Sequence, residues 1–357
     1  MGHLIPAAEL AKQLSQNHSL CVTLITQSID SEVPIAEQSI FDALPKQVNL
    51  VRIPILKSLV STTSSRLALV VDHLGVEVLD IAAELDIASY LFFLNNCMGI
   101  SLAFNIPKLD KEFTGKFEYL PKPLDLPGCV PLKGKDLPEP MHHRGTEELE
   151  AGVVKTLKED ERAPPVYTVG PLVMDYVMLN SYYECLKWLD EQPHRSVLYV
   201  SFGSGGSLTP AQMEKLALGL EMSRQRFLWV VKSPNEHDSS ARTKGLGMVV
   251  ISWIPQMKVF RHASTGGFLT HCGWNSSLES IVNAVPLIAW PLYAEQRLNA
   301  VFLVEGLKIA LTVDKDDDEF VRREEISRVV KCLTEDDEGR RMREKMRELS
   351  EAARVEQ

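Results

Sequence analysis

The sequence predicts an α/β protein built from two doubly wound domains. Short apolar segments typical of strands alternate along the chain with segments of helical periodicity, which is the pattern of a parallel sheet covered by helices. The chain has 357 residues, more than the roughly 250 to 300 that a single hydrophobic core usually serves. We therefore expect a first domain at 1–174, a linker at 175–192 and a second domain at 193–357.

The first domain begins with residues 4–16, whose apolar side chains recur at helical spacing and predict a helix. Strands are expected at 20–25, 50–55, 66–72 and 88–94, with a helix at 76–85. The Pro-, Gly- and charge-rich stretch 107–165 predicts loops with one helix at 147–157, and 166–173 closes the domain. Ligands of doubly wound sheets bind at the carboxyl ends of strands, where His3 and Asp72 are expected.

The second domain opens with a strand at 196–202, followed by Gly203-Ser204-Gly205-Gly206. Thr209 and Pro210 then predict the N-cap and first residue of a helix. A dinucleotide-binding fingerprint would need glycine at position 208, which is leucine, so a NAD site is not supported. A plain tight turn remains an alternative for the glycines. Further strands are expected at 227–231, 248–253 and 309–313, and helices at 297–306, 323–332 and 339–355.

An anion site is predicted after the apolar strand Gly267–Thr270, where a tight turn leads into a helix opened by Asn275 and Ser276. The N-terminus of such a helix carries N–H groups without intrahelical acceptors and about half a positive charge. Gly273 would let the backbone approach a ligand, and His271, Asn275 and Ser276 would add donors. The expected occupant is a phosphate.

Composition excludes several classes of partner. The formal net charge of −10 offers no basic patch for nucleic acid and no attraction to anionic membranes. The six cysteines show no CxxC pair, which is typical of reduced thiols. Asparagines and a proline in the uncharged run 87–107 argue against a membrane span, and the first residues show no charged leader with an apolar core, so we expect no signal peptide. We expect a cytoplasmic monomer.

Residues 253–296 resemble the donor-binding signature of plant family 1 UDP-glycosyltransferases. The match comprises W-x-P-Q at the start, H-C-G-W-N-S in the middle, Glu279 four residues after Asn275, and P-L-Y-A-E-Q at the end. Similarity extends to residues 2–6, 71–72, 169–172 and 200–206. Within the family the chain is most similar to the group that glucosylates hydroquinone and other small phenols.

The resemblance implies a GT-B fold, with two Rossmann-like domains facing each other across a cleft. His3 would follow the first central strand of such a fold, so we expect an N-terminal domain with that first strand missing. The segments between Val60 and Ser65, between Glu139 and Pro164, and between Ser233 and Gly247 are shorter than the family pattern. The chain is therefore expected to be truncated and internally shortened.

The resemblance also assigns a donor-binding role to each matched polar position. Trp253 would stack on uracil, Gln256 would contact the nucleoside, Glu279 would accept from the ribose hydroxyls, Ser204, His271, Gly273, Asn275 and Ser276 would hold the diphosphate, and Trp274, Glu295 and Gln296 would contact the sugar, with Ile254 completing the set. Glu295 replaces the aspartate more common in the wider family but keeps the carboxylate. No metal or other cofactor is implied, because the helix N-terminus would meet the charge of the leaving diphosphate.

His3 is the candidate base, since a neutral imidazole suits a phenol whose pKa is near 10. Asp72 would orient it, and both match the positions at which the family carries its base and its acid. Two hypotheses follow. One is inverting transfer of glucose from UDP-glucose to a small phenolic or phenylpropanoid hydroxyl, which gives a β-glucoside. The other is a non-catalytic remnant that at most binds a UDP-sugar.

Overall fold

The computed structural model describes residues 3–26, 35–52, 67–72, 75, 78–113, 116–126, 128–138, 171–173, 183–231, 245–251, 254–316 and 318–355. Trp253, the expected helix at 147–157 and most of the segment 233–247 lie outside them. The described residues form two compact units. Unit 1 contains residues 3–117 and 172–173, and unit 2 contains 118–138, 171 and 183–355. Residues 118–138 thus group with the second unit, and the boundaries 1–174, 175–192 and 193–357 stay a prediction.

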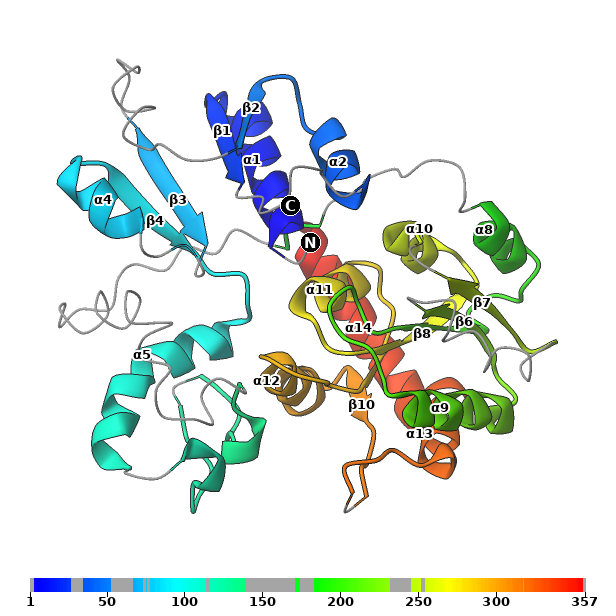
Figure 1. The fold of residues 1–357 in the computed structure, drawn as a ribbon. Helices are drawn as coiled ribbons and strands as arrows, with labels where there is room; N and C mark the ends of the chain where they lie inside the picture. Colours follow the sequence, from blue (N-terminus) through cyan, green and yellow to red (C-terminus); the bar gives the residue numbers. More distant parts are fainter. Residues whose placement is uncertain are drawn as a thin grey trace. The chain divides into compact units, whose positions relative to one another are not determined.

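Unit 1 consists of two small parallel sheets with their helices (Figure 1). Its elements are α1 (Leu4–His18), β1 (Val22–Thr26), α2 (Ile35–Asp42), β2 (Val48–Arg52), β3 (Ala68–Asp72), α4 (Val78–Glu84), β4 (Ala88–Phe92) and α5 (Cys97–Glu112). The 3₁₀ turn η1 (Phe117–Tyr119) begins with the last residue of the segment 3–117, and its other two residues group with unit 2. β1 pairs only with β2, and β3 only with β4, among the residues that the structure describes. The predicted strands and helices are confirmed to within a few residues, apart from those outside the described ranges. The helix α2 was not predicted, and α5 extends into the stretch 107–165, whose start was wrongly predicted as loop.

Within the described residues, the two strand pairs of unit 1 are separate sheets. In the doubly wound order 3-2-1-4-5-6, the first strand lies between the second and the fourth. The described residues include no strand ahead of α1 that could pair with both β1 and β3. The pairs β1-β2 and β3-β4 therefore stand on either side of the position that this strand has in the order. The strands are correspondingly poorly covered: Val70 of β3 is 44% exposed and Tyr90 of β4 is 51% exposed.

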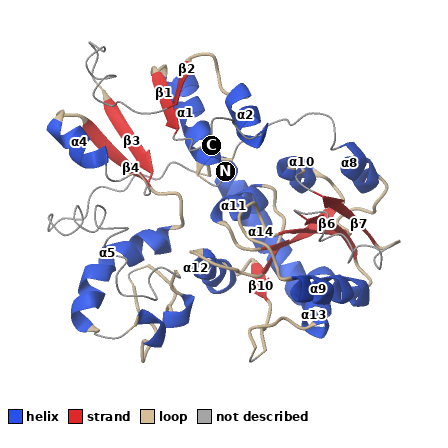
Figure 2. Ribbon diagram, in the orientation of Figure 1, coloured by secondary structure: helices blue, strands red, loops and turns tan. Residues whose placement is uncertain are grey.

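Unit 2 is a six-stranded parallel sheet with helices on both faces (Figure 2). Its elements are η2 (Gly134–Asp136), α8 (Tyr183–Asp190), β5 (Val197–Ser201), α9 (Pro210–Ser223), β6 (Arg226–Val231), β7 (Gly247–Ile251), α10 (Gln256–Arg261), β8 (Thr265–Thr270), α11 (Trp274–Val282), β9 (Leu287–Ala289), α12 (Gln296–Val301), the π-helical turn η4 (Phe302–Gly306), β10 (Ala310–Thr312), α13 (Arg323–Glu335) and α14 (Asp337–Val355). The order β7-β6-β5-β8-β9-β10 is the doubly wound order 3-2-1-4-5-6.

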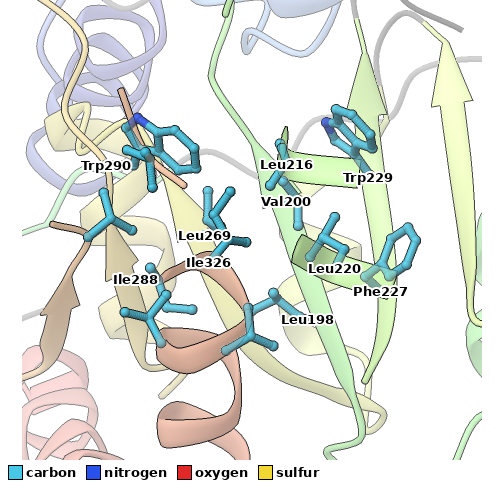
Figure 3. Packing of buried hydrophobic residues seen from close by; sticks show 14 of the residues in the cluster. Leu198, Val200, Leu216, Leu220, Phe227, Trp229, Leu269, Ile288, Trp290 and Ile326 are labelled. Atoms are coloured by element: carbon cyan, nitrogen blue, oxygen red, sulfur yellow. The ribbon is translucent and has the colours of Figure 1, made fainter. Parts of the chain in front are cut away.

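The core of unit 2 follows from strict alternation along its central strands. Leu198 and Val200 of β5 pack with α9 and α13 on one face, whereas Val197 and Tyr199 pack with the cluster that includes α8 and α10 on the other. Figure 3 shows the first of these faces, where Trp229 and other apolar side chains meet α9 and α13. Because successive strand residues point to opposite faces, a continuous apolar run is buried on both sides.

The boundaries of α9 show how local sequence sets an element. The Thr209 side chain accepts a hydrogen bond from the backbone N–H of Gln212 at 3.2 Å, and Pro210 occupies the first helical position. Both features were predicted from sequence, and both are confirmed.

No helix in the described part of the chain is long and apolar enough to cross a membrane.

Candidate active site

The strand order of unit 2 reverses between β5 and β8, and the matched loops follow these two strands. β5 and β8 are hydrogen-bonded neighbours, with Ser201 opposite Thr270 at their carboxyl ends. The glycine-rich loop 203–206 continues from β5, and the turn 271–273 continues from β8. Such a switch point is where open α/β sheets bind ligands. The topology therefore brings together two segments that the sequence separates by about 65 residues.

The His271 imidazole fits between two glycines, one from each loop. A Cβ atom added at Gly273 would lie 2.5 Å from Nε2 of His271, and one added at Gly203 would lie 2.5 Å from Cε1 and Nε2. Gly203 also has a φ of +70°, which favours glycine on its own account. Any larger residue at either position would displace the ring. The two glycines thus hold the His271 ring between the loops that follow β5 and β8.

The turn after β8 passes through Cys272, a buried non-glycine residue whose φ of 65° is in the strained left-handed region. Its backbone N–H donates to Oγ1 of Thr270 at 3.1 Å, and its carbonyl accepts from Nδ2 of Asn299 at 3.0 Å. Asn299 comes from α12 and is fully buried. Sequence reasoning missed Asn299, although an asparagine on the apolar side of a helix signals a buried polar contact.

The start of α11 corrects one expectation. The helix begins at Trp274 with Gly273 as its N-cap, and no side chain caps it. Asn275 and Ser276 therefore lie inside the first turn rather than at the cap. Their position still suits an anion site, because the N–H groups of a first helical turn have no intrahelical acceptors. Glycine occupies the cap because a side chain there would strike His271.

Gln256 and Glu279 form a partly buried hydrogen-bond network beside that turn. Nε2 of Gln256 donates to Oε2 of Glu279 and, at 3.1 Å, to Oγ of Ser276. The Tyr199 hydroxyl donates to Oε1 of Gln256 at 3.0 Å. Burial raises the pKa of the Glu279 carboxyl to about 7, while the hydrogen bond from Gln256 lowers it. The structure thus brings together Gln256, Ser276 and Glu279, all of which the signature match had singled out. Tyr199 belongs to the same network and was not predicted.

Two of the three expected sugar contacts, Glu295 and Gln296, lie at the start of α12. Gln296 is buried, and its Oε1 accepts from the backbone N–H groups of Leu292 at 2.9 Å and Tyr293 at 3.1 Å. Its amide thus supports the loop as well as offering donors. Glu295 is the partly exposed N-cap residue of α12.

The remaining matched positions differ in exposure. Ser204 is exposed, Trp274 is partly buried with its ring 5.9 Å from that of Phe302, and Ile254 is buried in the core beneath α10. Ile254 is therefore placed to support the site by packing.

Among the described residues, no group of three or more His, Cys, Asp or Glu side chains is arranged to hold a metal ion.

Unit 1 contains the second pair of candidate residues. Nδ1 of His3 lies 3.1 Å from Oδ2 of Asp72, within hydrogen-bond distance. His3 is the N-cap residue of α1, and Asp72 is the last residue of β3. Both side chains are partly exposed, at 42% and 29%. The expected hydrogen-bonded geometry is confirmed, and the catalytic role of the pair remains a prediction.

Comparison with known proteins gives consistent matches. Residues 182–318 match the family model described as "UDP-glucoronosyl and UDP-glucosyl transferase". The hydroquinone glucosyltransferase of Rauvolfia serpentina is 41% identical over 430 aligned residues, which cover 99% of this chain and 91% of that protein. UDP-glycosyltransferase 72B1 of Arabidopsis thaliana is also 41% identical, with 99% and 90% covered. An alignment of 430 residues exceeds the 357 of this chain, so internal shortening is confirmed.

Comparison with solved structures identifies the same family of proteins. Phytolacca americana UGT2, complexed with UDP-2fluoro-glucose and pterostilbene, matches with a TM-score of 0.87 and 41% identity over 99% of this chain and 92% of that one. The expected α/β fold of GT-B type is confirmed by this match. The chain belongs to the plant family 1 UDP-glycosyltransferases and is an enzyme of the glycosyltransferase class.

Proposed function

We propose that this chain transfers glucose from UDP-glucose to the hydroxyl of a small phenolic or phenylpropanoid acceptor, with inversion, giving a β-glucoside. The observation that carries the proposal is the convergence of the matched polar residues on the β5/β8 switch point. Its relatives are consistent with it: one is named for hydroquinone, and one was solved with a UDP-sugar analogue and pterostilbene. We also propose that the enzyme is a cytoplasmic monomer.

The donor would bind with its diphosphate at the first turn of α11. The N–H groups of that turn, together with His271 and Ser204, would stabilise the negative charge that grows on the leaving UDP. This arrangement requires no divalent metal. Glu279 would accept hydrogen bonds from the vicinal ribose hydroxyls, and Trp253 would supply an aromatic face for uracil. The glucose hydroxyls would meet Trp274, Glu295 and Gln296.

The acceptor would be activated by His3. If Nδ1–H of His3 donates to Asp72, the lone pair that acts as base lies on Nε2. Nε2 would take the phenolic proton as the phenol oxygen attacks C1 of glucose. The bond from C1 to the diphosphate oxygen breaks at the same step, and its electron pair leaves with UDP. Asp72 would hold the tautomer and stabilise the imidazolium that forms.

The experiment is release of UDP on mixing the purified chain with UDP-glucose and hydroquinone, with arbutin-type β-glucoside identified by mass spectrometry and proton NMR. Turnover in the unaltered chain with loss in His3→Ala supports the proposal. Equal rates in both proteins would remove His3 from the mechanism. Binding of UDP without any turnover would support the alternative of a non-catalytic remnant. A panel of phenols would then define the acceptor.

A further inference from the structure

The side chain of Tyr199 joins the core of unit 2 to the candidate nucleotide site. Its ring is buried on β5, stacked on Phe268 with centroids 5.0 Å apart and edge-on to Phe260 at 5.5 Å. These contacts need only an aromatic ring. The hydroxyl is a buried polar group, and burying it is unfavourable unless it is hydrogen-bonded. Its bond to Oε1 of Gln256 at 3.0 Å meets that requirement.

The hydroxyl contact determines which way the Gln256 amide faces. A glutamine amide has an accepting oxygen and a donating NH₂ group, and rotation by half a turn exchanges them. With Oε1 held by Tyr199, the NH₂ group faces Ser276 and Glu279 and donates to both. The reversed amide would turn its oxygen toward the Glu279 carboxylate, which repels it. Tyr199 thus favours the orientation that an ionised Glu279 requires.

The Gln256 amide in turn sets the Glu279 carboxylate. Its hydrogen bond goes to Oε2, which fixes the plane of the carboxylate. Oε1 of the same group is then oriented to accept from a ligand hydroxyl. Glu279 is only 6% exposed, so a small rotation of its carboxylate would remove that acceptor from reach of a ligand.

We infer that Tyr199 is a positioning residue for ribose recognition. Acting through Gln256, it aims Glu279 at the vicinal hydroxyls of the nucleotide. This inference rests on the proposed function, because it takes Glu279 as the ribose acceptor. It adds a residue outside the 253–296 signature, supplied by a neighbouring strand rather than by the nucleotide-binding loops.

The test compares two ligands, UDP and 2′,3′-dideoxy-UDP, which lacks the hydroxyls that Glu279 would recognise. Calorimetric titrations would measure the Kd of each for the unaltered chain, for Tyr199→Phe and for Tyr119→Phe. Tyr119→Phe is the matched control, because the Tyr119 side chain is 68% exposed, whereas Tyr199 is buried. Thermal melts would check that all three proteins are folded.

Tyr199→Phe is expected to weaken UDP binding about 5- to 10-fold, the effect of losing roughly 1 kcal/mol of hydrogen bonding. Binding of the dideoxy ligand should change less than about 2-fold, so the preference for UDP falls. In turnover assays the KM for UDP-glucose should rise by the same factor, with kcat at saturating donor within about 3-fold. Tyr119→Phe should match the unaltered chain in every measurement.

A second variant separates positioning from loss of stability. Gln256→Ala, on the partly exposed start of α10, should reduce the preference for UDP by itself. Adding Tyr199→Phe should then change that preference no further, since the path through Gln256 is already broken. Absence of UDP binding by the unaltered chain would overturn the proposed function and this inference together. A UDP preference that Tyr199→Phe leaves intact would overturn this inference alone.

Discussion

Nδ1 of His3 and Oδ2 of Asp72 lie 3.1 Å apart, although 69 residues separate the two in sequence. One side chain stands at the start of α1 and the other at the end of β3, so the pair depends on how the helix packs against the strands of unit 1. A base and an orienting carboxylate in this relation form the unit that deprotonates a hydroxyl in many transferases and hydrolases. The pair gives the first two predictions.

His3→Ala is expected to lower kcat with hydroquinone about 10²- to 10⁴-fold, which is the usual contribution of a positioned general base. UDP affinity should be unchanged, since the proposed role of His3 is toward the acceptor hydroxyl and none of the proposed UDP contacts involves its side chain. Steady-state kinetics and UDP titration measure the two effects. His18→Ala, an exposed histidine at the end of the same helix, is the matched control and should behave as the unaltered chain.

Asp72→Asn keeps the size of the side chain but removes its charge. The amide would no longer favour Nδ1–H on His3 or stabilise the imidazolium, so kcat should fall by at least about 10²-fold while thermal stability changes little. The measurement is kcat as a function of pH for a phenol of high pKa. Unchanged kcat in this variant would show that the carboxylate does not take part.

Gly203→Ala tests the fit of His271 between the two loops. The new Cβ would lie 2.5 Å from the imidazole, so the ring must shift and UDP binding should weaken by 10-fold or more, on the order of 1.4 kcal/mol. Gly128→Ala is the matched control, because Gly128 also has a positive φ, +73°, but its Cβ would meet nothing within 4 Å.

Both alanine variants should lose roughly 1 to 2 kcal/mol of stability from the strained backbone. Only Gly203→Ala should lose UDP affinity as well. Urea denaturation of the two variants measures the effect of the strained backbone on stability. UDP titration measures the effect of the new Cβ pressing on His271. Equal UDP affinity in both would mean that His271 does not contribute to donor binding.

Burial of Glu279 predicts a pH dependence of stability. Its pKa is raised to about 7 in the folded chain from an ordinary value of 4.5, so between these pH values the folded state binds a proton that the unfolded state does not. Relative to the ionised form, the protonated Glu279 carboxyl stabilises the folded chain. This stabilisation is fully present below about pH 4.5 and is lost as pH rises through about 7. Above that pH the ionised carboxylate costs on the order of 3 kcal/mol.

Glu279→Gln removes this titration and keeps an acceptor for Gln256. The variant should therefore gain stability relative to the unaltered chain as pH rises from 5 to 8, as measured by urea denaturation without ligand. A constant difference in unfolding free energy between the two proteins over that range would contradict the raised pKa. Ser350→Ala, at a second buried polar side chain of unit 2, should show no such pH dependence.

The two units are expected to differ in local stability. Val70 and Tyr90 are about half exposed on two-stranded sheets, whereas Leu198 and Leu269 are at most 1% exposed on a six-stranded sheet. Amide hydrogen exchange should therefore be faster in β3 and β4 than in β5 and β8, because local opening needs less free energy where little apolar surface is buried. Equal protection in the two sets would contradict this expectation.

Much of the protein was determined by sequence alone. Apolar runs such as that of β8 and local signals such as Thr209 with Pro210 specify strands and helices through short-range physics, namely alternation and capping. The strand, turn and helix at residues 267–276 likewise predicted an anion site, and the resemblance of residues 253–296 to the family's donor signature implied that the ligand is a nucleotide sugar. Trp253 lies outside the described residues, so its predicted role was not tested.

Only the tertiary structure decided the rest. The sequence could not show that Gly203 and Gly273 enclose His271, that Asn299 holds the strained carbonyl of Cys272, or that Tyr199 orients Gln256. Gly203, Asn299 and Tyr199 each meet a partner from another segment of the chain, and Gly203 reaches His271 because β5 and β8 are neighbours in the sheet. Local propensity acts over a few residues, whereas the order of strands in a sheet, and hence the neighbours of a loop, depends on how the whole core packs.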